Sequence, residues 1–177
     1  MNVSEAIRTK RAVRQFKAEP LPEDVVTAIL KAGRRSQSSK NTQPWRFVAV
    51  TEWKTLEKLS KLGQYAGHIA GAGLAVVIFT PDPNQRFSIM FDAGQAAAYM
   101  QLAAWELGVG SCLASIYEPE QARELLCAPA AWHTRIAISF GYPADESVLT
   151  NPPKAGGRSG FDDLVHFNRW DNSTCNE

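Results

Sequence analysis

The longest hydrophobic segment of the chain covers residues 86–107 and predicts a central helix. Apolar side chains occur on every side of this helix, so no wide face is left for water. At about 1.5 Å per residue the helix would span roughly 33 Å, which is the width of a small domain. Asp92, Gln95 and Gln101 interrupt the segment and argue against a membrane span. One domain can hardly cover such a helix on all sides, so we expect part of it to face a second subunit.

The rest of the pattern predicts shorter helices and strands on both sides of this segment. Caps and helical spacing predict helices over residues 2–10, 22–35, 53–62 and 119–126. Apolar, β-branched runs predict strands over residues 46–51, 74–80, 111–117 and 135–140. No internal repeat or domain boundary interrupts this order. It predicts a single α+β domain over residues 1–177, in which helices wrap a sheet.

The C-terminal part has a different character. Residues 144–160 are rich in Pro, Gly and Asn and lack any periodicity. A long connection of this kind is usually functional, a linker, or laid across another surface. Residues 161–170 contain enough apolar side chains to dock as a terminal element, and we expect residues 171–177 to be frayed.

Composition narrows the classes of function. The chain has 177 residues, 45% of them hydrophobic, and a formal net charge of +1, which gives no case for binding nucleic acid. The three cysteines, Cys112, Cys127 and Cys175, form no CxxC pair, which argues against a disulfide framework and a zinc site. Charged residues occupy the N-terminus where a signal peptide needs an apolar stretch. We therefore expect a cytoplasmic protein with no metal, no nucleic acid and no membrane among its partners.

Basic residues nevertheless gather in three places, at residues 8–14, 31–35 and 154–158. The first group could clamp a phosphate, because arginine offers a planar fork to phosphate oxygens and lysine a point charge. The alternative is a solvated basic turn. In the last group, two glycines would let the backbone approach an anion closely.

Two further segments could line a ligand. Residues 37–43 carry amide and hydroxyl groups, which suit a polar heterocycle or a sugar chain, or else only cap a turn. Residues 108–115 could present backbone amides to a flat ligand, or only end the preceding helix. His68, His133 and His166 have no neighbours at the spacing of a triad or metal site. The sequence thus lacks a clear general acid or base, as expected where a cofactor carries the chemistry.

Four segments in this order resemble the nitroreductase family, whose members are FMN-dependent oxidoreductases that fold as intertwined homodimers. The matching segments are KRAVRQF, SSKNTQPWRF, DAGQAAAYMQLAAWELGVGSC, and GYP followed by GGR and DDLVHFNRW. The resemblance covers about residues 3–170. It implies a mostly antiparallel sheet wrapped by helices and a long core helix buried between two subunits.

The resemblance also implies a role for each matching position. Lys10 and Arg11 would lie near the FMN phosphate, and Arg14 would reach the pyrimidine edge, where a cation stabilises the charge of reduced flavin. Ala12 stands where the family often has Ser, and Gln37 where Pro is usual. Neither departure removes a charge, so weaker FMN retention is the most we expect.

The other implied positions fall into three groups. The partner subunit would contribute polar groups to the flavin ring and its ribityl chain from Gln37, Ser38, Ser39 and Asn41. The ring near N5 would be lined by Gly110, Ser111, Ala114 and Ser115. The chain would return to the phosphate at Gly157 and Arg158.

The implied activity is electron transfer from NADPH or NADH through flavin N5 to a nitroaromatic, quinone or enone, by a ping-pong mechanism and without a catalytic side chain. Many relatives insert a lid between the second strand and the long helix, where this chain has only residues 80–85. We therefore expect an open site with little selectivity. A relative that modifies flavin or oxidises a substrate, or a non-catalytic flavin-binding dimer, remains an alternative. The preferred nucleotide and the natural acceptor stay open.

Overall fold

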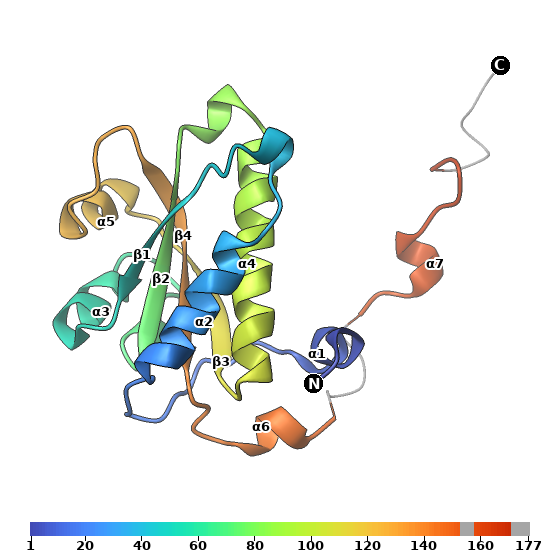
Figure 1. Cartoon of the computed structure of the whole chain (residues 1–177), viewed down its shortest axis with the longest axis horizontal. Coiled ribbons are helices and arrows are strands. Elements are labelled where there is room, and N and C mark those ends of the chain that lie inside the picture. Colours follow the sequence, from blue (N-terminus) through green and yellow to red (C-terminus); the bar gives the residue numbers. More distant parts are fainter. Residues whose placement is uncertain (153–157, 171–177) are drawn as a thin grey trace.

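A computed structural model describes residues 1–152 and 158–170 and shows an α+β domain built on one antiparallel sheet (Figure 1). Its strands are β1 (Arg46–Val50), β2 (Leu74–Thr80), β3 (Gly110–Ser115) and β4 (His133–Gly141). They lie in the order β1-β2-β4-β3, and each neighbouring pair is antiparallel. The expected fold class is confirmed. The last strand begins two residues earlier and ends one residue later than predicted.

The helices follow the predicted order. They are α1 (Val3–Thr9), α2 (Glu23–Arg34), α3 (Trp53–Leu59), α4 (Ser88–Glu106), α5 (Pro119–Leu125), α6 (Ser147–Thr150) and α7 (Phe161–Leu164). Short 3₁₀ turns occur at η1 (Ser39–Asn41), η2 (Gly67–Ile69) and η3 (Pro83–Gln85). The Asn2 side chain caps α1 by accepting a hydrogen bond from the Glu5 amide at 2.9 Å. The connection over residues 144–160, predicted to be irregular, contains α6.

Two hydrophobic cores lie on opposite faces of the sheet. α2 and α4 cover one face, and α3 and α5 cover the other (Figure 1). All seven residues of β2 are buried because both faces of this central strand are covered. Its sequence therefore reads as a continuous apolar run instead of an alternating one.

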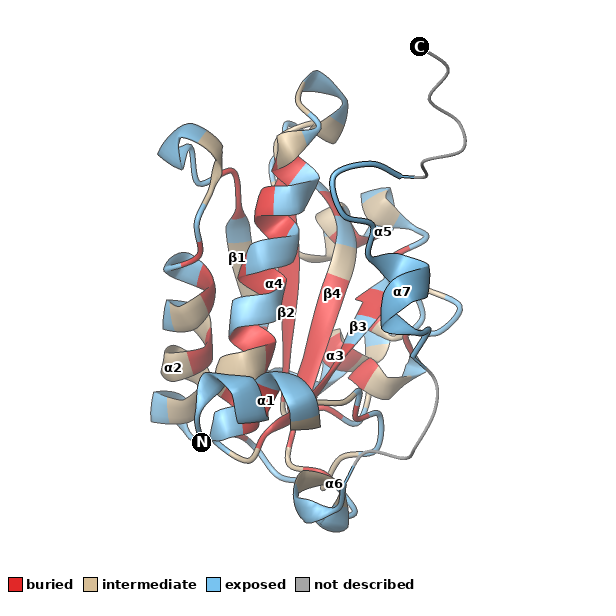
Figure 2. Cartoon of the chain, turned by 90° about the vertical axis from the view of Figure 1, so that its right-hand side faces the viewer, coloured by how far each residue is buried: buried red, intermediate tan, exposed pale blue. Residues whose placement is uncertain are grey.

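The long helix α4 is buried on only one side within this chain. Its buried residues face α2 and the sheet, whereas Phe87, Met90, Phe91 and Tyr99 are exposed, Phe91 by 73%. Figure 2 shows this exposed side of α4 between α2 and α7. A helix that is apolar all round but covered on one side leaves a hydrophobic surface open, which is typical of an interaction site. That a second subunit covers it stays a prediction.

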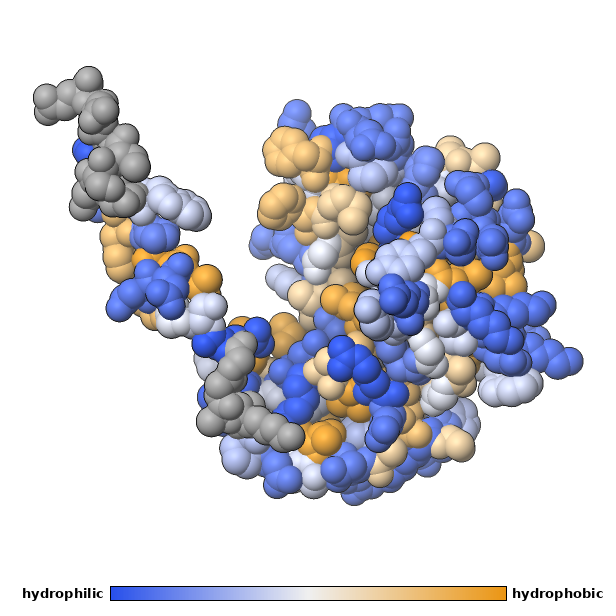
Figure 3. Space-filling view, turned by 180° about the vertical axis from the view of Figure 1, so that it is seen from behind, coloured by the Kyte–Doolittle hydropathy of each residue, from blue (hydrophilic) through white to orange (hydrophobic). Residues whose placement is uncertain are grey.

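The C-terminal segment does not dock on its own domain in the single chain, so its docking stays a prediction for a second surface. Residues 158–170, including α7, are exposed throughout, and the segment stands clear of the domain in Figures 1 and 3. Phe161, Phe167 and Trp170 expose 66%, 76% and 81% of their surface. Their apolar side chains therefore find no core within the described chain.

Candidate functional site

The basic segment lies along the outer edge of β3. Ala12 forms an isolated parallel bridge with Ser111, and the Val13 amide donates to the Ser111 carbonyl at 3.0 Å. Gly110 makes this approach possible, because a Cβ at this position would lie only 2.6 Å from Cβ of Val13. The glycine turn and the basic segment therefore meet, and Lys10 to Arg14 run beside the strand that follows α4.

Polar contacts from α4 fix the same region. The Thr9 hydroxyl accepts a hydrogen bond from the indole of Trp105 at 3.0 Å, and the Gln101 amide donates to the Ser111 hydroxyl at 3.3 Å. Ser111 is fully buried, so its hydroxyl belongs to this internal contact. Both bonds involve the last two turns of α4. The basic segment is thus held at the C-terminal end of this helix.

The positive charges of this segment lack carboxylate partners in the described chain. None of the ion pairs found among residues 1–152 and 158–170 includes Lys10, Arg11 or Arg14. Lys10 is half-buried, and burial lowers the pKa of its ammonium, an effect that only the ionised form of the nearby Cys112 would oppose. Burial raises the pKa of the Cys112 thiol, against the positive charges of Arg14 and Lys10. A partly buried cation without a counter-charge favours binding of an anion.

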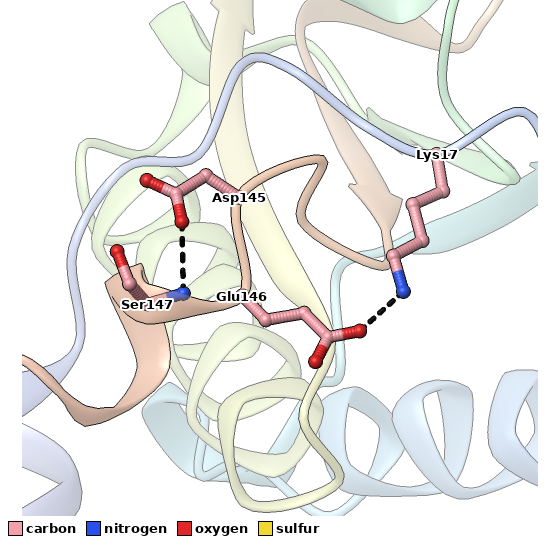
Figure 4. A network of polar contacts seen from close by, with 4 residues as sticks. All are labelled: Lys17, Asp145, Glu146 and Ser147. Carbon is pink, nitrogen blue, oxygen red and sulfur yellow. Dashed lines mark hydrogen bonds and ion pairs between the residues drawn. The ribbon is translucent and has the colours of Figure 1, made fainter.

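The chain returns toward this segment near residue 150. The Arg11 guanidinium donates to the Asn151 carbonyl, and the Lys17 ammonium pairs with the Glu146 carboxylate (Figure 4). This hydrogen bond raises the pKa of Lys17 and lowers that of Glu146. The structure thus brings the start of the C-terminal connection beside the basic segment. Of the two residues expected to return to the phosphate, Gly157 lies outside the described residues, and Arg158 is exposed.

The outer edge of β3 offers backbone groups. Ser111 turns its carbonyl outward to Val13, and backbone groups of an antiparallel strand alternate in direction. Those of Leu113 and Ser115 therefore also point off the sheet. Both residues are exposed, whereas the side chain of Ala114 is buried. The amides expected around residues 114 and 115 are thus available at Ser115, at the end of the strand.

His68 lies in η2 and contacts β4, although the spacing of the histidines in the sequence indicates no catalytic triad or metal site. Its Nδ1 lies 2.7 Å from Oγ of Ser139, whose hydroxyl donates to the Cys112 carbonyl at 3.3 Å. Nε2 is buried and has no hydrogen-bond partner in the described part of the chain. Burial lowers the pKa of His68, and the positive charge of Arg14 lowers it further. A lone histidine in the sequence gives no sign of this arrangement, because Ser139 is 71 residues away.

The polar loop over residues 37–43 lies at the other end of α4. The Ser39 amide donates to Oδ1 of Asp92 at 3.0 Å, and the Arg86 guanidinium donates to the Thr42 hydroxyl at 2.7 Å. Gln37 and Asn41 are exposed, and Ser38 and Ser39 are half-buried. Trp105 follows Asp92 by 13 positions in the helix, or about 20 Å along the axis. One chain therefore does not bring this loop to the basic segment.

An apolar cavity of about 310 Å³ opens beside the exposed side of α4. Small residues of α4, among them Ala93, Gly94 and Ala97, form one wall, and Leu113 and Ile136 lie on the opposite side. Periodicity along the sequence did not reveal this cavity, because its walls come from separate elements that only the fold brings together.

The sequence model of the nitroreductase family matches residues 7–68 and 59–142. These ranges include the basic segment, the polar loop, α4 and the edge of β3. The chain belongs to the nitroreductase family. Membership places it among the oxidoreductases and confirms the resemblance noted in the sequence.

Individual relatives of this nitroreductase-family chain match it over most of its length. A Methanothermobacter thermautotrophicus protein with the provisional name NADH dehydrogenase/NAD(P)H nitroreductase is 29% identical over 177 aligned residues, covering 96% of this chain and 88% of that protein. A solved FMN-dependent nitroreductase from Clostridium difficile superimposes with a TM-score of 0.81 at 28% identity, covering 93% of this chain and 98% of the other.

A more distant structure shares the nitroreductase fold. NADPH:FMN oxidoreductase from Vibrio harveyi, in complex with NAD⁺, superimposes with a TM-score of 0.83 over 95% of this chain and 77% of the other. At 21% identity this likeness supports the fold alone. Among the described residues of our chain, no helix is long and apolar enough to cross a membrane, and no group of metal-ligating side chains is found.

Proposed function

We propose that this nitroreductase-family protein is an FMN-dependent oxidoreductase that takes electrons from NADPH or NADH and passes them to nitroaromatics, quinones or related acceptors by a ping-pong mechanism. The observation that carries the proposal is the set of cations at the edge of β3 that have no carboxylate partner among residues 1–152 and 158–170. Lys10, Arg11 and Arg14 carry three positive charges beside outward-pointing backbone groups. A flavin phosphate would supply the missing negative charge.

The described residues fit this cofactor. Lys10 and Arg11 would bind the phosphate, Arg14 would face the pyrimidine edge, and the amide of Ser115 would lie near the ring. In this proposal Gly110 and Ser111 position the basic segment. Ala12 offers the phosphate no hydroxyl, whereas the serine that the family often has at this position would offer one. Ala114 fixes the strand through its buried side chain. Gly157 and Arg158 complete the phosphate site in the proposal.

A homodimer completes the proposed site. The polar loop and the basic segment lie at opposite ends of α4 in one chain, so Gln37, Ser38, Ser39 and Asn41 cannot reach the cations of their own subunit. Antiparallel packing of two α4 helices across a two-fold axis would place the loop of each subunit beside the cations of the other. The exposed apolar side of α4 supports such packing.

When bound, FMN would supply a ring that accepts a hydride and returns electrons to an acceptor. The protein would orient the ring from the edge of β3 and stabilise its negative charge with Arg14. The short turn η3 replaces a lid, which supports an open site of low selectivity. The three cysteines form no CxxC pair in the sequence, which supports a reducing, cytoplasmic location.

An anaerobic titration tests the proposal. The purified protein is reconstituted with FMN, and the visible absorbance of the flavin is followed after addition of NADPH and then NADH. We expect rapid bleaching that a nitroaromatic or quinone reverses. Bound flavin that stays oxidised would contradict the nicotinamide-dependent activity and favour a flavin-modifying, substrate-oxidising or non-catalytic role. Absence of flavin binding would contradict the cofactor itself.

A further inference from the structure

Asp92 is a buried carboxylate in α4 that makes a contact outside the hydrophobic core. It is only 3% exposed, and its Oδ1 accepts a hydrogen bond from the Ser39 amide at 3.0 Å. Its Oδ2 is buried and has no hydrogen-bond partner among the described residues. Burying a carboxylate is unfavourable unless polar contacts compensate. The core gains nothing from this charge, so its effect lies in the loop that it contacts.

That loop has an unfavourable backbone. Lys40, Asn41 and Gln43 adopt left-handed conformations, with φ of 53°, 53° and 47°. Residues with a Cβ rarely adopt this backbone conformation, and they keep it only where the surrounding structure stabilises it. Three of them within four positions require an external support.

The loop is supported at both ends, by α4 at its start and by the segment that precedes α4 near its end. Asp92 binds the Ser39 amide at the start, and Arg86 donates to the Thr42 hydroxyl at 2.7 Å near the end. Inside the loop, the Ser38 hydroxyl accepts a hydrogen bond from the Gln43 amide at 2.9 Å. Of these two contacts, only that of Asp92 comes from α4, and its side chain is buried, whereas the contact of Arg86 is exposed.

We infer that Asp92 is a positioning residue, which holds its own loop in the conformation that presents Ser38 and Asn41 to the flavin of the partner subunit. The inference rests on the proposed function. It assigns Asp92 to the active site of the opposite subunit, although Asp92 touches neither cofactor nor substrate. Its carboxylate acts by accepting one amide hydrogen bond, so an isosteric amide that keeps the oxygen should preserve the effect.

Limited proteolysis tests the loop without any flavin. Lys40 is exposed, and trypsin cleaves after it when the loop opens. In the full-length apo-protein, we expect Asp92→Ala to raise cleavage at Lys40 about tenfold relative to cleavage at Lys58 and Lys61 of α3, because a hydrogen bond to a charged group is lost. Asp92→Asn should stay near wild type. Asp82→Ala is the matched control, since Asp82 accepts the Asn84 amide at 2.9 Å in a different turn.

FMN affinity, measured by quenching of flavin fluorescence, gives the second readout. Asp92→Ala should weaken FMN binding roughly tenfold, with Asp92→Asn and Asp82→Ala near wild type. Equal increases of cleavage at all lysines would overturn the inference, because Asp92 would then stabilise the domain and not the loop. Loop opening with unchanged FMN affinity would also overturn it. If wild type itself binds no FMN, the proposed function fails, and with it the assignment to the flavin site.

Discussion

The indole N–H of Trp105 donates a hydrogen bond to the hydroxyl of Thr9 at 3.0 Å. Trp105 is 2% exposed, so the polar N–H of its buried side chain is satisfied by this hydrogen bond and not by water. Thr9 is the last residue of α1, and the basic segment begins at the next position. The bond therefore ties the start of the proposed phosphate site to the last turn of α4.

Replacing Thr9 by valine should destabilise the protein and weaken FMN binding. The substitution keeps the shape of the side chain but leaves the buried indole N–H without an acceptor, which costs about 1–3 kcal/mol. Thermal unfolding and an FMN titration measure the two effects. Thr55→Val is the matched control, because the Thr55 hydroxyl donates to the carboxylate of the exposed Glu52. If the Thr9→Val variant were as stable as wild type, the hydrogen bond from the indole would contribute nothing to the stability of the protein.

Removing the charge of Arg14 should weaken FMN binding by at least about tenfold, since a hydrogen bond that involves one charged group contributes roughly 1.5–3 kcal/mol. Arg14→Gln keeps a hydrogen-bonding side chain of similar length. Arg123→Gln serves as the control, because Arg123 pairs with Glu120 on α5. The measurement is quenching of flavin fluorescence. Equal FMN affinity in both variants would contradict the place of Arg14 in the site.

A charge on the exposed side of α4 should break the proposed dimer. Phe91→Asp places a carboxylate in the middle of an interface that we expect to be apolar, so monomers and loss of FMN should follow. Tyr65→Asp is the control, because Tyr65 is an aromatic residue with the same 73% exposure in the turn between α3 and η2. Light scattering coupled to size-exclusion chromatography gives the mass. If the Phe91→Asp variant remained a dimer, the interface would not lie on the exposed side of α4.

Mixing two defective variants should restore flavin sites. Arg14→Gln damages the site of its own subunit, whereas Asp92→Ala damages the loop that serves the partner. A mixed dimer then carries one site with both defects and one site with none. The two variants carry different affinity tags, are unfolded and refolded together, and the mixed dimer is then isolated through both tags. We expect one of its two sites to bind FMN with wild-type affinity. If the loop of each subunit served the site of its own subunit, each site of the mixed dimer would carry one defect, and mixing would restore nothing.

Stability should fall on acidification because of His68. Its pKa is lowered in the folded protein, so the unfolded chain takes up the proton first as the pH decreases below the usual value of 6.5. The contribution of neutral His68 is therefore present above this pH and is lost as the pH falls toward the folded pKa. His68→Asn should flatten this part of the profile in denaturant unfolding, and His133→Asn, at an exposed position, should not. Identical profiles for His68→Asn and wild type would contradict the assignment.

The sequence predicted those parts of the fold that depend on local signals. The Asn2 cap, the proline before α2 and the apolar run of β2 each determine an element through neighbouring residues. Family motifs then marked the basic segment and the polar loop. Contacts between distant positions, such as Ser39 with Asp92 or His68 with Ser139, leave no periodic signal and appear only in the folded chain.

The surface on which the C-terminal segment docks could not be predicted, for a related reason. Apolar side chains at Phe161 and Phe167 indicate that residues 158–170 have a surface to cover, but composition does not say whose surface. Within one chain they remain exposed. The same holds for α4, whose all-round apolar pattern predicted burial that a single domain provides on one side only.

The separation of the polar loop from the basic segment along α4 has a consequence for how the protein behaves at low abundance. In the proposed dimer neither subunit alone contains a complete flavin site, so the retention of FMN depends on the concentration of the protein. Dilution toward the dissociation constant of the dimer would release FMN even from intact chains. Flavin content per subunit would then report how much of the protein is paired.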